Sequence, residues 1–142
     1  MAIPSHLALE IVTPDRAVTH DEVDEVQIPG ADGYFGVLPG HTPLLASLQV
    51  GQLWYRKGTE ITYLSVAFGF AEVLPDRVTI LARMAEKADE IDVDRATAQL
   101  KRAESDLARA ATMPPAELER ARISLLKALT RLQVANRGRT RV

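Results

Sequence analysis

Short apolar runs separated by turn residues fill the chain from Leu7 to about Ala85. Some runs alternate apolar and polar side chains, as around Leu9 and Ile11, and others are rich in β-branched or aromatic residues. This pattern is typical of an antiparallel sandwich or barrel, in which each strand buries one face. We predict a β-sandwich domain over residues 1–88. Its clearest strands centre on residues 7–11, 26–28, 53–55, 61–64, 68–73 and 78–81.

After residue 88 the apolar period lengthens to that of a helix. One stripe, spaced 3, 4, 3, 4, 3, comprises Val93, Ala96, Leu100, Ala103, Leu107 and Ala110. A second stripe with the same spacing comprises Leu118, Ala121, Leu125, Ala128, Leu132 and Ala135. Each stripe marks one face of a helix, and their equal lengths favour an antiparallel pair. We therefore predict an α+β chain with a helical hairpin domain over residues 89–142.

The ends of the two predicted helices carry recognisable signals. Asp92 suits the N-cap of the first helix, and Met113-Pro114-Pro115 must end it because proline cannot continue a helix. Pro115 suits the first turn of the second helix. Asn136 and Gly138 are the expected stop.

The predicted hairpin is poor in large apolar side chains. A fully buried leucine contributes roughly 1.5–3 kcal/mol and an alanine much less, whereas ordering each residue costs about 1–2 kcal/mol of backbone entropy. We therefore hypothesise that the hairpin can leave the sandwich and rearrange.

Charge and aromatic content divide at the same place as the apolar period. Residues 1–90 hold 6 Lys/Arg and 13 Asp/Glu, a net of −7, whereas residues 91–142 hold 11 and 6, a net of +5. All seven aromatic residues lie between Tyr34 and Phe70. The chain has no cysteine, no apolar run long enough to cross a bilayer, and a start unlike a signal peptide. We expect two units of different character and only indirect membrane association.

One segment, from Gly33 to Leu45, reads Gly-x-x-Gly-x-x-Pro-Gly-His-x-Pro-Leu-Leu. It resembles the signature of the epsilon subunit of bacterial F-type ATP synthase, the equivalent of the mitochondrial delta subunit. The segment from Leu64 to Val73 is similar to that family's Ser-x-Gly-x-x-Glu-Val stretch. It departs at Ala67-Phe68, and Gly69 sits near the usual glycine. The resemblance runs from about His6 to Asn136.

The resemblance implies a rotor subunit of the central stalk that does no catalysis itself. The sandwich would bind the gamma subunit and rest on the c-subunit ring, coupling proton flow to ATP synthesis. The basic helices would face the alpha/beta catalytic subunits and inhibit ATP hydrolysis, with Arg122 and Arg137 among the contacts. The expected location is the cytoplasmic face of the bacterial plasma membrane. A solvated basic face is the alternative for the helices.

A second implication of the resemblance is an ATP site. Ile91-Asp92-Val93-Asp94-Arg95-Ala96 resembles a family motif associated with ATP in several bacterial members, and convergent guanidinium groups suit phosphates. At one position, Lys127, better-binding members carry arginine. The alternative is an N-cap with surface salt bridges. No cofactor is required in either case, and the tentative ATP set is Glu86, Ile91, Asp92, Arg95, Ala96, Arg102, Arg120, Lys127 and Arg131.

Other candidate residues have weaker signals. Tyr34, expected at the tip of the signature loop, is either an exposed anchor for the c ring or a core tyrosine. His41 fits a structural or interface role, and the histidines show no metal-ligand spacing. No nucleophile elbow or phosphate loop is present. A stand-alone nucleotide- or nucleic-acid-binding adaptor is the alternative function, although the basic helices lack aromatics for base stacking and we expect no nucleic acid partner.

Overall fold

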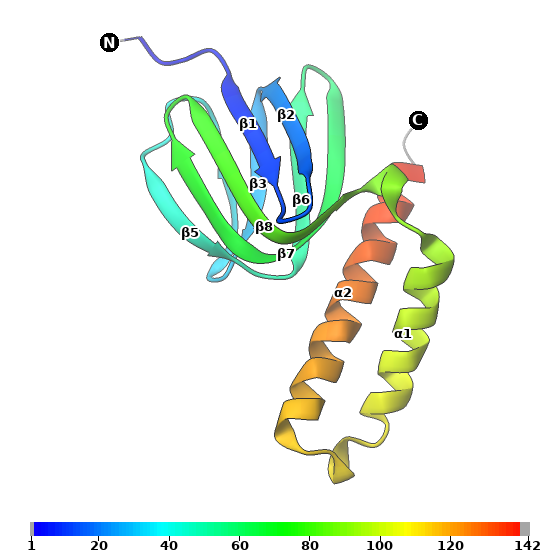
Figure 1. The fold of residues 1–142 in the computed structure, drawn as a ribbon. Coiled ribbons are helices and arrows are strands. Elements are labelled where there is room, and N and C mark those ends of the chain that lie inside the picture. Colours follow the sequence, from blue (N-terminus) through cyan, green and yellow to red (C-terminus); the bar gives the residue numbers. More distant parts are fainter. Residues whose placement is uncertain (1, 140–142) are drawn as a thin grey trace.

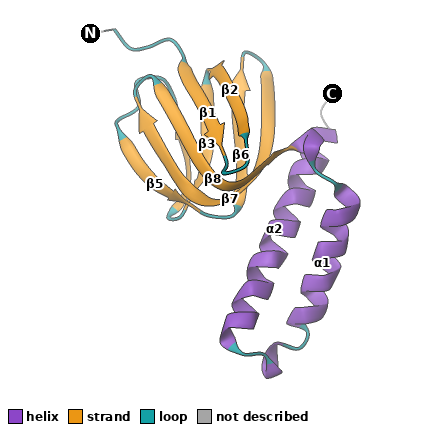
Figure 2. Ribbon diagram, viewed as in Figure 1, coloured by secondary structure: helices purple, strands orange, loops and turns teal. Residues whose placement is uncertain are grey.

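The computed structural model describes residues 2–139 as a β-sandwich followed by a helical hairpin (Figures 1 and 2). This arrangement confirms the predicted fold class. The strands are β1 (Leu7–Val12), β2 (Ala17–Val23), β3 (Glu25–Gly30), β4 (Gly33–Val37), β5 (Leu44–Leu48), β6 (Gly51–Lys57), β7 (Glu60–Leu74) and β8 (Arg77–Lys87). Two 3₁₀ turns and two α-helices follow, namely η1 (Ala88–Glu90), α1 (Val93–Leu107), η2 (Ala110–Thr112) and α2 (Pro115–Arg139).

The strands form one continuous hydrogen-bonded network in the order β2-β1-β8-β7-β5-β3-β4, with β6 joining β3 to β7. Alternation along β1 works as predicted, because Leu7, Leu9 and Ile11 are each at most 1% exposed. Strand pairing within residues 2–139 is antiparallel, with the exception that β1 runs parallel to β8. The first and last strands of the sandwich therefore lie side by side.

Strand β7 joins two segments that the sequence predicted as separate runs. Its first part pairs with β6 and its second part with β5, while β8 lies along its other edge. Between the two parts, Phe68 and Gly69 have φ values of 59° and 116°. A side chain on Gly69 would place its Cβ 2.0 Å from the carbonyl oxygen of Leu81. Only glycine fits this close approach of two strands.

The helix signals are mostly confirmed. Asp92 is the N-cap of α1, because its Oδ1 accepts the backbone N–H of Arg95 at 3.0 Å, and α2 begins at Pro115. The predicted stop is wrong, since α2 continues past Asn136 and Gly138 to Arg139. Packing explains the difference: a Cβ on Gly138 would lie 2.7 Å from the Cβ of Ala88, so this glycine lets α2 approach η1 closely.

The two helices meet along the predicted stripes. Their buried alanines are Ala96, Ala103, Ala121, Ala128 and Ala135, and the stripe leucines are partly buried. Helix α2 lies on the sandwich side of the hairpin (Figure 1), where Val134 and Ala135 pack with Ile91 and the ring of Tyr63. Within the described residues, neither helix is long and apolar enough to cross a membrane.

Candidate functional site

A hollow of about 420 Å³ lies where β8 meets both helices of the hairpin. Each element contributes two lining side chains, and on each helix the two are four residues apart, so they project from one face. The lining residues are Met84 and Glu86 from β8, Arg95 and Gln99 from α1, and Lys127 and Arg131 from α2. One carboxylate thus faces three cations, which suits an anionic ligand.

The central contact of this hollow is an ion pair between Arg131 and Glu86. The Arg131 Nε donates to Glu86 Oε1 at 2.7 Å, and Nη2 donates to Oε2 at 3.3 Å. The remaining Nη1 donates to Gln99 Oε1 at 3.2 Å. The side chains are only 12% and 26% exposed. A two-point contact of this kind, largely out of water, fixes the guanidinium of α2 against the sandwich.

Two more cations of α2 contact aromatic rings of β7. The Lys127 Nζ lies 5.7 Å from the ring centroid of Phe68, and the Arg137 guanidinium carbon lies 5.2 Å from that of Tyr63. Together with Arg131, these residues point toward the sandwich, so part of the positive charge of α2 that was predicted to bind a partner faces the sandwich. Arg122, by contrast, is exposed.

The structure brings four of the nine residues of the tentative ATP set to one place: Glu86, Arg95, Lys127 and Arg131. Three others have structural positions, since Ile91 packs against α2, Asp92 caps α1 and Ala96 is buried. The remaining two are not brought to the hollow. Arg102 is exposed two turns further along α1, and Arg120 lines a separate hollow with Asp106 and Arg109 near the hairpin turn.

Arg120 and Arg131, both members of the ATP set, do not converge in the docked hairpin. Eleven residues of α2 separate them, a rise of about 16 Å. Sequence reasoning also missed Gln99 and Phe68. Phe68 stood out only as a departure from the family pattern, and Gln99 has no motif signal, although it stands four residues after Arg95 and so shares its helix face.

The two remaining partner candidates lie in the sandwich. Tyr34 belongs to strand β4 and not to a loop tip; it is 50% exposed, and its hydroxyl accepts the backbone N–H of Gln52 at 3.1 Å. Tyr34 is thus neither a fully exposed anchor nor a core tyrosine, because its hydroxyl is hydrogen-bonded while half of its surface is exposed to solvent. His41 donates from Nδ1 to the carbonyl oxygen of Thr42 at 2.6 Å, a local turn contact.

The link between sandwich and hairpin is held by a second two-point ion pair. Arg16, between β1 and β2, donates through Nη1 and Nη2 to Glu90 of η1 at 2.9 and 3.0 Å. Glu90 also accepts the backbone N–H of Lys87 at 2.9 Å. The hydrogen bonds from Arg16, supported by that of Lys87, lower the pKa of Glu90 below its ordinary range.

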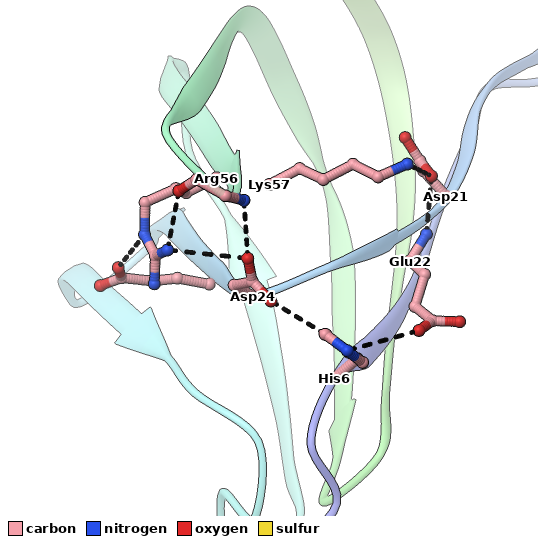
Figure 3. Close-up of polar contacts among 8 residues, drawn as sticks. His6, Asp21, Glu22, Asp24, Arg56 and Lys57 are labelled. Carbon is pink, nitrogen blue, oxygen red and sulfur yellow. Dashed lines mark hydrogen bonds and ion pairs between the residues drawn. The ribbon is translucent and has the colours of Figure 1, made fainter.

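A further polar cluster joins the segment before β1, the link between β2 and β3 and the turn between β6 and β7 (Figure 3). His6 donates from Nδ1 to Asp24 at 2.9 Å, and Asp24 also accepts the backbone N–H of Gly58 at 2.7 Å. The Gly58 contact and then the His6 contact lower the pKa of Asp24. Four further ion pairs belong to the cluster, namely His6–Glu22, Arg56–Asp24, Arg56–Glu25 and Lys57–Asp21. Among residues 2–139, no group of His, Asp and Glu side chains is arranged to hold a metal ion.

Family models match both units of the chain. The model described as ATP synthase, Delta/Epsilon chain, beta-sandwich domain matches residues 6–88. The corresponding long alpha-helix domain matches residues 89–136. The chain belongs to the ATP synthase delta/epsilon family. This membership confirms the resemblance that was drawn from Gly33 to Leu45 and from Leu64 to Val73.

Relatives in the delta/epsilon family align over most of the chain. The ATP synthase epsilon chain 2 of Syntrophotalea carbinolica is 51% identical over 132 residues, covering 93% of this chain and 95% of that protein. The ATP synthase epsilon chain of Koribacter versatilis is 55% identical over 98 residues, 69% of each chain. A chain in the Euglena gracilis mitochondrial ATP synthase OSCP/F1/c-ring structure shares the fold, with a TM-score of 0.81 at 24% identity. That match covers 96% of this chain and 84% of the other.

Proposed function

We propose that this chain, an epsilon-type central-stalk subunit of F-type ATP synthase, couples rotation to ATP synthesis through its sandwich and restrains ATP hydrolysis through its hairpin. Its work is mechanical and regulatory, and catalysis belongs to other subunits. The single observation that carries this proposal is the division of the chain into an acidic sandwich with an exposed apolar patch and a basic hairpin docked largely through its charged side chains. The complex would hold the chain at the cytoplasmic face of the bacterial plasma membrane.

The gamma subunit is the partner that we assign to the exposed apolar face. Phe70 of β7 and Leu81 of β8 are cross-strand partners, and each is 54% exposed. Leu45 of β5 points to the same side and is 71% exposed. Three neighbouring apolar side chains on one sheet face form a patch of the kind that often marks a protein contact.

Copurification tests this assignment. A Leu81→Asp variant should lose most of the gamma subunit in a pull-down, because a charge would be buried at the contact. The matched control is Leu126→Asp on α2, since Leu126 is similarly exposed at 52% but lies outside the sandwich. Equal recovery of gamma with both variants would exclude this face as the gamma contact.

The c-subunit ring is assigned to the region of Tyr34, where the held hydroxyl and half-exposed ring make a rigid anchor. The alpha/beta subunits are assigned to the basic hairpin. Because Lys127, Arg131 and Arg137 contact the sandwich in the docked state, they can reach an acidic partner only after the hairpin moves away.

The inhibitory role is tested by the ATPase activity of the catalytic complex. We expect faster hydrolysis when the full chain is replaced by a chain ending at Lys87, where β8 ends. The shortened chain should still bind gamma, which serves as the control for incorporation. Equal hydrolysis rates in complexes with equal gamma content would remove the inhibitory claim.

ATP is the proposed regulatory ligand of the hollow around Arg131. Support comes from three cations gathered within 420 Å³, a volume suited to a small ligand. Calorimetry should detect binding of ATP to the isolated chain, weaker in Arg95→Gln and unchanged in Lys101→Gln, an exposed cation of the same helix. Absence of heat at millimolar ATP would rule out this ligand. The alternative of a stand-alone adaptor is not favoured, because family models cover residues 6–136.

A further inference from the structure

Phe68 has an uncommon backbone conformation for a large side chain. Its φ of 59° lies in the left-handed region, which glycine adopts freely and aromatic residues avoid. It stands in the middle of β7, where that strand changes its partner from β6 to β5. A residue in this conformation persists only where the surrounding structure fixes it, so contacts around Phe68 must stabilise it.

The neighbouring backbone explains the conformation but not the choice of phenylalanine. Gly69 must remain glycine because β8 passes so close, and Phe68, directly before it, shares the positive φ of this stretch of β7. A glycine at residue 68 would adopt the same path with less strain. The aromatic side chain is therefore better explained by a contact outside strand β7.

The partner of that side chain is on the other unit of the molecule. The half-buried ring of Phe68 lies under the Lys127 ammonium of α2, with 5.7 Å between Nζ and the ring centroid. Four residues further along α2, Arg131 forms its ion pair with Glu86 of the adjacent strand. The two contacts share one face of the helix. We propose that Phe68 is a retaining residue for the hairpin. Its cation–π contact with Lys127 holds α2 on the sandwich, although its own backbone in β7 is strained.

The contact between Phe68 and Lys127 acts in the docked state of the isolated chain, and it requires neither bound ATP nor the catalytic subunits. The expected effect of this contact on docking is small but measurable. A cation–π contact that is partly open to water shifts an equilibrium by about two- to fivefold. The hairpin also touches the sandwich through the Arg131–Glu86 ion pair, the Arg137–Tyr63 contact and a small apolar cluster around Val134 and Ala135. Loss of one contact of this size among so few should lower the docked fraction.

Hydrogen exchange of the α2 amides in the full chain tests the proposal. We expect Phe68→Leu, which keeps an apolar side chain but loses the ring, to exchange about two- to fivefold faster over residues 127–139. Phe68→Tyr should match the unchanged chain, because tyrosine restores a ring face. Lys127→Gln should reproduce Phe68→Leu, and Lys101→Gln should have no effect.

Two further results separate retention from simple loss of stability. Phe68→Gly should release α2 in the same way while leaving the thermal midpoint of the sandwich unchanged or raised, since glycine relieves the backbone. Phe68→Leu combined with Lys127→Gln should exchange no faster than either alone, because both remove the same contact. The proposal is overturned if Lys127→Gln leaves α2 exchange unchanged, a test that does not touch the sandwich, or if the two single effects multiply.

Discussion

Replacing Glu86 by glutamine removes the negative charge that faces the Arg131 guanidinium across β8 and α2. The replacement keeps the length of the side chain and one oxygen that can accept a hydrogen bond. Arg131 is only 12% exposed in its side chain, so its charge would remain largely out of water beside a neutral amide. The perturbation is therefore electrostatic and leaves the shape of the site intact.

The expected magnitude follows from this burial. Breaking a fully buried pair by removing one partner costs about 3–5 kcal/mol. Glu86 is 26% exposed, and the amide oxygen and Gln99 still accept from Arg131, so we expect a loss of about 2 kcal/mol. The comparison pair is Asp21–Lys57, joined at a similar 2.8 Å but with side chains 38% and 57% exposed. Asp21→Asn should cost less than about 1 kcal/mol.

Urea unfolding followed by circular dichroism at helical wavelengths measures this loss of stability in the hairpin. The midpoint should fall in Glu86→Gln with little change in slope, because the surface exposed on unfolding is the same. Fluorescence of Trp54, the one tryptophan, gives a separate record of the sandwich. The reasoning fails if Glu86→Gln lowers the helical midpoint no more than Asp21→Asn does.

Three other variants test the backbone, the link and the helix cap. Gly69→Ala should lower the free energy of unfolding by about 2–4 kcal/mol and markedly lower the thermal midpoint, whereas Gly58→Ala, with open space at its Cβ, should lose only about 1–2 kcal/mol. Arg16 holds the pKa of Glu90 below its ordinary value of 4.5, so the stability from this pair is complete above that pH and lost as pH falls through the folded-state pKa. The stability difference between the unchanged chain and Glu90→Gln should thus be constant near neutrality and shrink in acid titrations. Asp92→Ala should weaken α1 by about 1 kcal/mol, seen as faster amide exchange in its first turn.

The features that sequence predicted are those with a local cause. Alternation in β1 and the alanine-leucine stripes of the hairpin depend on the period of one element, which the chain displays directly. Asp92 and Pro115 act within a single turn, and both are where the pattern puts them. The stop at Asn136 and Gly138 failed because tertiary packing of α2 against Ala88 outweighed a local signal.

The candidate site was predictable only in part, because it joins distant segments. Glu86, Arg95 and Arg131 line one hollow, as the family resemblance implied, but the hydrogen bonds of Arg131 to Glu86 and Gln99 have no sequence signature. The pair between Arg16 and Glu90 spans 74 residues. Phe68 was visible as a departure from the family pattern, yet its partner on α2 could be found only from the fold.

The parallel pairing of β1 with β8 has a consequence for the order in which the molecule forms. Strand β1 can pair with β8 only after β8 has been synthesised. This pairing therefore cannot form until the chain has been made through residue 81. Pairing across such a separation is intrinsically slow. The hairpin follows these strands in the chain, and the surface that it docks on comprises β6, β7 and η1 together with Glu86 of β8. Because α2 docks on strands of the sandwich, we expect the fast-forming hairpin to dock after the slow pairing of β1 with β8.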